Sequence, residues 1–231
     1  MKFLLPAFFA IFLSLIVPRQ GFAQSNSRYI SIRSGLSLPM MDYSSYSLDE
    51  GCFTSIGFNV SADATWYFYK GFGIEFSGGL NLHPVEVGVL GYEIVVNDPF
   101  MSDTYIRSEP YKVLTAMAGP AYHFQIYDKL SISTKLLFGV AEAKTPHQIH
   151  KPVYLPLGPE IYEVGSSIDR QFSWIAGAGV RYDITNCYGL IFNTEMTSRK
   201  FGFGFNTPTG IRTDYKVISF INFTLGVQFN L

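Results

Sequence analysis

The chain has 231 residues, of which 48% are hydrophobic and only 15% are charged, and its formal charge at neutral pH is −1. Such a balance excludes the basic footprint of a nucleic-acid-binding protein, and two cysteines are too few for a disulfide scaffold or a zinc site. The charged fraction is well below the roughly 25% of a typical soluble domain.

The first predicted element is a secretory signal peptide over residues 1–23. Lys2 precedes an uncharged apolar run at positions 3–17, and a small-residue pattern ends at Ala23, which is the usual order of a signal peptide. A retained membrane anchor is the alternative, but the run is shorter than the roughly 20 residues that span a bilayer. We expect cleavage near Ala23, which removes two basic residues and leaves residues 24–231 with a charge of −3.

Alternation of apolar and polar residues dominates the rest of the chain and predicts β-strands with two different faces. It is clearest at the C-terminus, where every odd position from Ile221 to Leu231 is apolar and every even position is polar or small. That length matches a tilted transmembrane strand of about 9 to 11 residues. Eight segments follow this template, at about 30–38, 55–68, 72–82, 113–124, 130–140, 172–183, 188–196 and 221–231. The fourth is the weakest, because Val113 and Met117 fall on its inner face.

The connections between these segments alternate in length. Outer-membrane barrels have short periplasmic turns and long extracellular loops, and bacterial ones have an even number of strands. The sequence therefore predicts an all-β fold: one transmembrane antiparallel up-and-down β-barrel of eight strands, with both termini in the periplasm. Short connections lie at 69–71, 125–129 and 185–187, and long ones at 39–53, 83–110, 142–170 and 198–215.

Two further stretches, Ala118–Tyr122 and the apolar-alternating terminus Val227–Leu231, complete a pattern that covers residues 24–231. The chain resembles the outer-membrane β-barrel domain proteins of the Bacteroidota type, which share the architecture of small OmpA-like and OmpX-like barrels. The resemblance implies a place in the cell outer membrane, contact with membrane lipid and lipopolysaccharide, and insertion by the barrel assembly machinery. Such strands often end in Phe, whereas here Phe229 is third from the end and Leu231 closes the chain.

Charged residues on the predicted inner faces form the main candidate site. An eight-stranded barrel is only wide enough inside for side chains to fill it, and an unpaired buried charge is costly. We therefore interpret these residues as a barrel-interior polar network that fills the lumen, with a gated ion path as the alternative. The set is Arg33, Asp63, Glu75, Lys135, Arg181, Asp183 and Glu195.

Neither a catalytic site nor a cofactor or metal site is expected. Lipid A acyltransferases and deacylases use this fold, but no histidine begins the His-x-Ser-Asn stretch of the deacylases, and His83, Ser102 and Asp103 share a loop without a distinguishing spacing. His147 and His150 form a His-x-x-His pair without a third ligand at a telling spacing.

The long loops are the expected functional part, since long loops in compact folds are usually functional. Valines and isoleucines between Val85 and Val96 suggest a projecting hairpin, and the run Phe201–Asn206 is expected to extend the seventh strand and expose aromatic side chains. The predicted function is a structural or surface-interaction role with an extracellular or surface protein partner. A narrow channel is the alternative, and a lipid A-modifying enzyme is a weaker one.

Four positions test the predicted topology. Cys52 lies in a long loop and Cys187 in a short turn, so we expect no disulfide between them, because the two Cα atoms would need to approach within about 7 Å. An impermeant maleimide is expected to reach Cys52 on intact cells unless the loop shields it. Replacing Phe223 by arginine should impair insertion far more than replacing Asn222 by arginine, because position 223 is expected to face lipid and position 222 a polar lumen.

Overall fold

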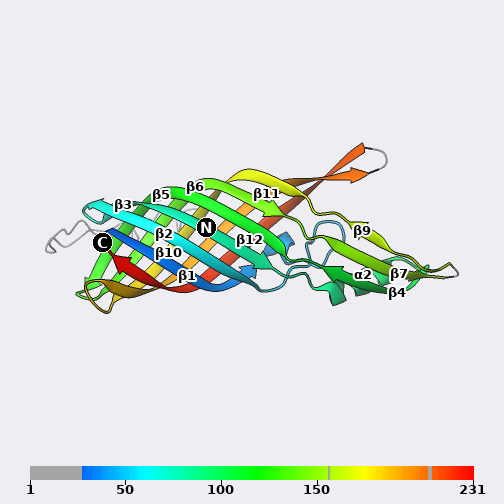
Figure 1. The fold of residues 1–231 in the computed structure, drawn as a ribbon, viewed down its shortest axis with the longest axis horizontal. Helices are drawn as coiled ribbons and strands as arrows, with labels where there is room; N and C mark the ends of the chain where they lie inside the picture. The colour runs from blue at the N-terminus through cyan, green and yellow to red at the C-terminus, as the bar shows by residue number, and fades with distance from the viewer. Residues whose placement is uncertain (1–27, 156, 208–209) are drawn as a thin grey trace, which may run out of the picture.

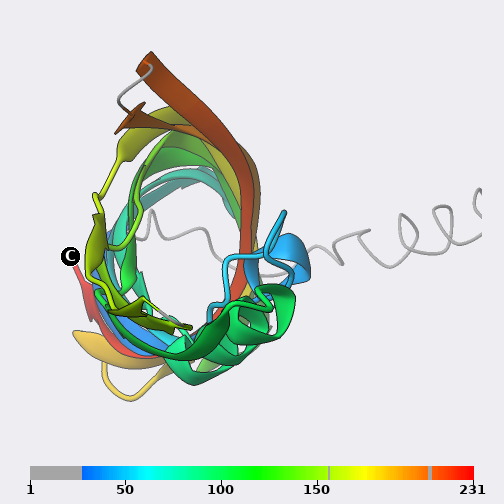
Figure 2. The same cartoon turned by 90° about the vertical axis from the view of Figure 1, so that its right-hand side faces the viewer.

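The computed structural model describes residues 28–155, 157–207 and 210–231, so the predicted signal peptide and its cleavage near Ala23 lie outside the described residues. Eight antiparallel strands close into a barrel in which β1 pairs with β12 (Figures 1 and 2). This confirms the predicted transmembrane up-and-down barrel. The barrel strands are β1 (Arg28–Pro39), β2 (Gly57–Tyr69), β3 (Phe72–His83), β5 (Tyr111–Tyr127), β6 (Leu130–Lys144), β10 (Ile168–Asp183), β11 (Tyr188–Thr207) and β12 (Gly210–Asn230).

The two faces of each strand follow the alternation in the sequence. In β1, Ile30 and Ile32 are exposed on the outside, whereas Ser31 and Arg33 are buried inside. Large aromatic side chains lie on the outside near the short turns, as in the aromatic girdles of membrane barrels. Among them are Trp66, Phe68, Phe72, Tyr182 and Tyr188. In the part of the chain that the structure describes, no helix is long and apolar enough to span a membrane.

The short connections lie at one end of the barrel, which we call the turn end. At the β2–β3 turn, Lys70 and Gly71 have φ angles of 45° and 83°, a left-handed conformation that favours glycine. A Cβ atom at Gly71 would also lie 2.3 Å from the carbonyl oxygen of His123 on the neighbouring strand. This turn therefore requires glycine at position 71.

At the other end, the loop end, the second and third long connections fold together. They contain α2 (Val87–Asn97), β4 (Met101–Ser108), β7 (Gln148–Tyr154), β8 (Gly158–Pro159) and β9 (Tyr162–Val164). β4 from one connection pairs with β7 from the other, and β7 also pairs with β8 and β9. We call residues 84–110, 145–155 and 157–167 the loop unit. It projects beyond the barrel mouth (Figure 1).

The hairpin predicted between Val85 and Val96 is wrong, because residues 87–97 form α2. Leu90 is buried with Phe53 and Ile106, and Ile94 packs against this cluster. The β-branched residues of the segment favour a strand only weakly, and packing of one helix face onto β4 and the first loop overrides that preference. The first loop also carries a short 3-10 helix, η1 (Met41–Tyr43).

The long loop predicted at 198–215 is instead a continuation of β11 and β12, which stay paired up to Thr207 and Gly210. We call residues 198–207 and 210–216 the hairpin extension. The predicted extension of the strand is confirmed, but the predicted exposure of its aromatic side chains is wrong, because Phe201 and Phe203 are buried. Since Phe and Gly alternate, the aromatic rings share the inner face and pack in the barrel mouth.

The closed ring predicts heat-modifiable migration on gels. Within the closed ring all eight barrel strands pair on both sides, so the ring has no strand edge open to detergent. We expect unboiled protein to migrate as a compact β-rich species and boiled protein near the mass of the mature chain. Equal migration of both samples, with a helical circular dichroism spectrum, would contradict the fold.

The structure sharpens the cysteine prediction. Both thiols are free, as expected, but Cys52 is buried in the cluster at the barrel mouth and Cys187 is exposed at the turn end. Burial raises the pKa of the Cys52 thiol, which lowers the reactive thiolate fraction.

An impermeant maleimide should therefore label neither cysteine on intact cells, and Cys187 alone once the outer membrane is permeabilised. Mass spectrometry of tryptic peptides measures both sites. This expectation replaces the sequence-based one for Cys52, because the packed first loop shields its thiol. Labelling of Cys52 before denaturation would contradict that packing.

Candidate functional site in the barrel interior and the loop unit

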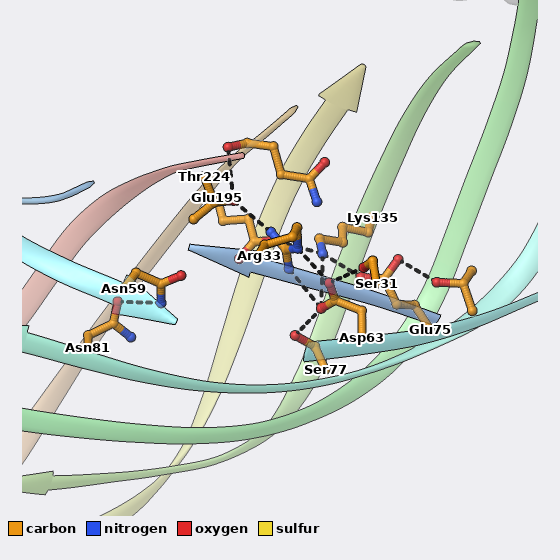
Figure 3. A network of polar contacts seen from close by, with 12 residues as sticks. Ser31, Arg33, Asn59, Asp63, Glu75, Ser77, Asn81, Lys135, Glu195 and Thr224 are labelled. Carbon is orange, nitrogen blue, oxygen red and sulfur yellow. Dashed lines mark hydrogen bonds and ion pairs between the residues drawn. The ribbon is translucent and has the colours of Figure 1, made fainter. Parts of the chain in front are cut away.

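A buried arginine on β1 organises the middle of the lumen (Figure 3). The Nε and Nη2 atoms of Arg33 donate to the two carboxylate oxygens of Asp63 at 2.5 and 2.7 Å, and Nη1 lies 2.6 Å from Oε1 of Glu195. The Arg33 side chain is 0% exposed. This bidentate geometry is the strong form of a charge-assisted hydrogen bond, and it joins β1, β2 and β11 across the lumen.

Lys135 on β6 completes the centre of the network. Its Nζ atom lies 2.7 Å from Glu195 and 3.8 Å from Asp63, and it also forms an ion pair with Glu75 on β3. Hydroxyl groups supply further hydrogen bonds: Ser31 and Ser77 donate to Asp63, Thr65 donates to Glu75, and Thr224 accepts from Arg33. We call Arg33, Asp63, Glu75, Lys135 and Glu195 the central network. Its side chains connect five strands, in addition to the backbone pairing between neighbouring strands.

Arg181 and Asp183 lie apart from the central network. The Nε atom of Arg181 donates to Asp183 at 3.0 Å, and Nη2 donates to Asn230 at 3.1 Å. The guanidinium also lies 5.2 Å from the centroid of the Tyr29 ring. Since Asp183 is near the β10–β11 turn, this pair closes the turn end. The structure thus divides the seven predicted residues into a central group of five and a turn-end pair.

The loop end of the lumen is filled by apolar side chains, of which the sequence analysis placed only Val113 and Met117 on an inner face. The signal for them is a break in the alternation, because Leu136-Leu137 and Trp174-Ile175 place one apolar residue on each face. Tyr43 of the first loop enters the same cluster, and its hydroxyl lies 3.1 Å from Nδ1 of His83. We call this cluster the apolar plug: Tyr43, Cys52, Tyr111, Val113, Met117, Leu137, Ala141, Ala143, Ile175, Phe201, Phe203, Ile218 and Phe220.

Between the central network and the apolar plug lies a cavity of about 10 Å³, lined among others by Asn59, Ser61, Glu195 and Asn222. A cavity of this volume holds about one water molecule. Asn222 is buried in the wall of this cavity, whereas Phe223 is exposed on the outer face. The two side chains therefore have the orientations that the sequence predicts, and the difference between arginine at the two positions stays a prediction.

The histidines considered for catalysis and metal binding do not come together. His83 bonds to Tyr43, whereas Ser102 donates to the carbonyl of Val153. His147 lies 3.4 Å from Glu163, and His150 stacks on Tyr162 in the loop unit. Among the described residues, no three histidine, cysteine or acidic side chains are grouped to hold a metal ion.

The sequence matches no protein-family model and no curated protein. Solved structures of similar fold are outer-membrane β-barrel proteins. Ail, the attachment invasion locus protein of Yersinia pestis, is 16% identical, with 90% of this chain and 100% of that chain covered and a TM-score of 0.45. AlkL is 12% identical, with 93% and 94% covered and a TM-score of 0.49. A major outer membrane protein of Thermus thermophilus is 8% identical, with 90% and 100% covered and a TM-score of 0.49.

Proposed function

We propose that this protein is a non-catalytic, non-conducting barrel of the bacterial outer membrane that holds its loop unit outside the cell as a binding surface for a protein partner. In this arrangement residues 1–23 are cleaved on export, the barrel assembly machinery inserts the mature chain, and lipid and lipopolysaccharide surround its apolar outer face. No cofactor is needed for this role.

The observation that carries the proposal is the shared fold of two long connections. β4 and β7 come from different loops and pair over the span from Met101 to Ser108, and α2 packs against β4 through Leu90 and Ile106. Loops that served only to connect neighbouring barrel strands would not need to pair with each other. A rigid surface outside the membrane suits partner binding, because a pre-ordered surface loses less entropy when it binds.

The packed lumen supports a non-conducting role. The turn-end pair, the central network and the apolar plug occupy successive levels of the barrel, and a water-sized cavity lies between the last two. A permeating ion would have to displace the bidentate ion pair of Arg33 with Asp63 and a packed aromatic cluster. In planar bilayers, purified protein should therefore give no steady single-channel current, and reproducible steps would contradict this part of the proposal.

The loop unit can be removed without cutting the barrel. His83 pairs directly with Tyr111, and Lys144 pairs with Ile168. A short Asn-Gly turn can therefore replace residues 84–110 or residues 145–167 between strands that are already neighbours, since such turns suit β-hairpins. Heat-modifiable migration of the shortened variants shows whether the barrel still closes.

Intact cells that carry the full or the shortened protein are treated with a membrane-impermeant cross-linker, and the linked proteins are identified by mass spectrometry. We expect a partner that is linked to the full protein and lost from both shortened variants. An identical set of linked proteins for all three would overturn the proposed role of the loop unit.

A further inference from the structure

The outer side of α2 carries apolar side chains that nothing in the described part of the chain covers. Tyr92 and Val96, one helical turn apart, are 66% and 60% exposed, and Phe100, just after the helix, is 69% exposed. A contiguous exposed apolar surface outside the membrane is typical of an interaction site. We call these three side chains the α2 stripe.

The surroundings of the α2 stripe are acidic. Residues 84–110 contain five acidic residues and one arginine, a net charge of −4. Of the five, Glu93 follows Tyr92 on the helix, and Asp98 lies between Val96 and Phe100 in the sequence. A partner for this stripe must therefore combine apolar contact with positive charge.

The hairpin extension on another side of the barrel mouth has these properties. It holds four basic residues and one acidic residue, a net charge of +3. Arg199 and Lys200 are exposed, as are the apolar side chains of Ile211 and Tyr215. The Nζ atom of Lys200 lies 4.9 Å from the centroid of the Tyr215 ring, so cation and aromatic surface lie together.

The hairpin extension is also accessible to another molecule. Pairing between β10 and β11 ends at Ala176 and Met196, so beyond this point β11 pairs only with β12. Figures 1 and 2 show the outer part of this hairpin standing away from the ring and away from α2. The hairpin extension therefore does not contact α2 of the same copy, although both elements project from the same end of the barrel.

We propose that the α2 stripe of one copy packs against the hairpin extension of a second copy beside it in the membrane. Copies inserted in one membrane point the same way, so both elements lie on the same side and can meet. Pairing of two α2 stripes would bring acidic residues together, which is unfavourable. The contact is therefore heterologous, and it joins copies into rings or rows. It rests on the proposed function, because it names the partner of the loop unit.

Two charge-reversal variants test this pairing. One carries Glu93→Lys and Asp98→Lys beside the α2 stripe, and the other carries Arg199→Glu and Lys200→Glu on the hairpin extension. Each variant alone presents like charges on both surfaces of the contact. A mixture of the two restores opposite charges where the α2 stripe of one variant meets the hairpin extension of the other.

Association is measured by energy transfer between donor and acceptor maleimide dyes on Cys187, which is exposed at the turn end, whereas Cys52 is buried. Protein is reconstituted at fixed density in lipid vesicles, and heat-modifiable migration confirms that each variant is folded. For wild type we expect transfer that weakens as salt increases. Each variant alone should associate about tenfold less, as expected for loss of an interfacial hot spot, and the mixture should recover the wild-type signal.

Three outcomes would overturn the inference: no transfer for wild type above that of random mixing, unchanged transfer in either single variant, or no recovery in the mixture. A Tyr92→Ser and Val96→Ser variant should also associate less if the stripe itself is in the contact. If these experiments fail while the shortened loop variants still lose a different protein partner, self-association is wrong and the proposed function stands.

Discussion

Replacing Arg33 by methionine is expected to lower the free energy of unfolding of the barrel by about 3 to 5 kcal/mol, the usual effect of removing one partner of a buried ion pair. Arg33 supplies the hydrogen bonds to both oxygens of Asp63 and an ion pair to Glu195. Methionine fills part of the volume of the arginine. It leaves Lys135 as the one cation of the central network for three carboxylates. The loss is therefore electrostatic rather than a matter of packing.

Urea unfolding in lipid vesicles, followed by the fluorescence of Trp66 and Trp174, measures this change. Lys112→Met is the matched control, because its Nζ atom lies 4.0 Å from Glu109 and both side chains are about half exposed; pairs of this kind contribute below about 1 kcal/mol. The double variant Arg33→Met with Asp63→Asn should be more stable than Arg33→Met alone. Equal stabilities of wild type and Arg33→Met would mean that the central network does not hold the strands together.

The barrel was predictable because its signal is local. Each strand carries its own alternation, and an eight-stranded ring leaves one arrangement in which outward side chains meet lipid and inward ones meet each other. The alternation of apolar and polar residues is enough to predict that Arg33, Asp63 and Glu195 point inward. It does not predict their exact partners, because it gives the face of the strand on which a residue lies but not the height of that residue along the barrel axis. Arg181 and Asp183 share the inner face and still lie at another level.

The features that were missed depend on contacts between distant segments. α2 is stabilised because Leu90 packs against Phe53 and Ile106. β4 forms a strand because it pairs with β7 of the next long connection. Apart from Val113 and Met117, the apolar plug was missed for a different reason. An inward Leu137 or Ile175 is preceded by an equally apolar outward residue, so a rule of strict alternation assigns only one of the two.

Leu225→Arg is expected to impair insertion by about 2 to 4 kcal/mol, the cost of arginine on the lipid face near the bilayer midplane. Leu225 is 66% exposed on the outer surface of β12. It lies opposite Ser34 of β1 and Phe192 of β11, between Phe229, which pairs with Tyr188 near the turn end, and the loop end. Phe223, two residues further along the same face, should behave similarly.

Two controls separate lipid exposure from general disruption of β12. Leu225→Phe keeps an apolar side chain on the same face and should insert normally. Tyr215→Arg introduces the same charge on the same strand, but in the hairpin extension beyond the barrel, where water solvates it. The fraction of heat-modifiable protein in isolated membranes reports insertion for each variant. If Leu225→Arg inserted as well as Tyr215→Arg, position 225 would not face lipid, and the inside and outside of the barrel would be wrongly assigned.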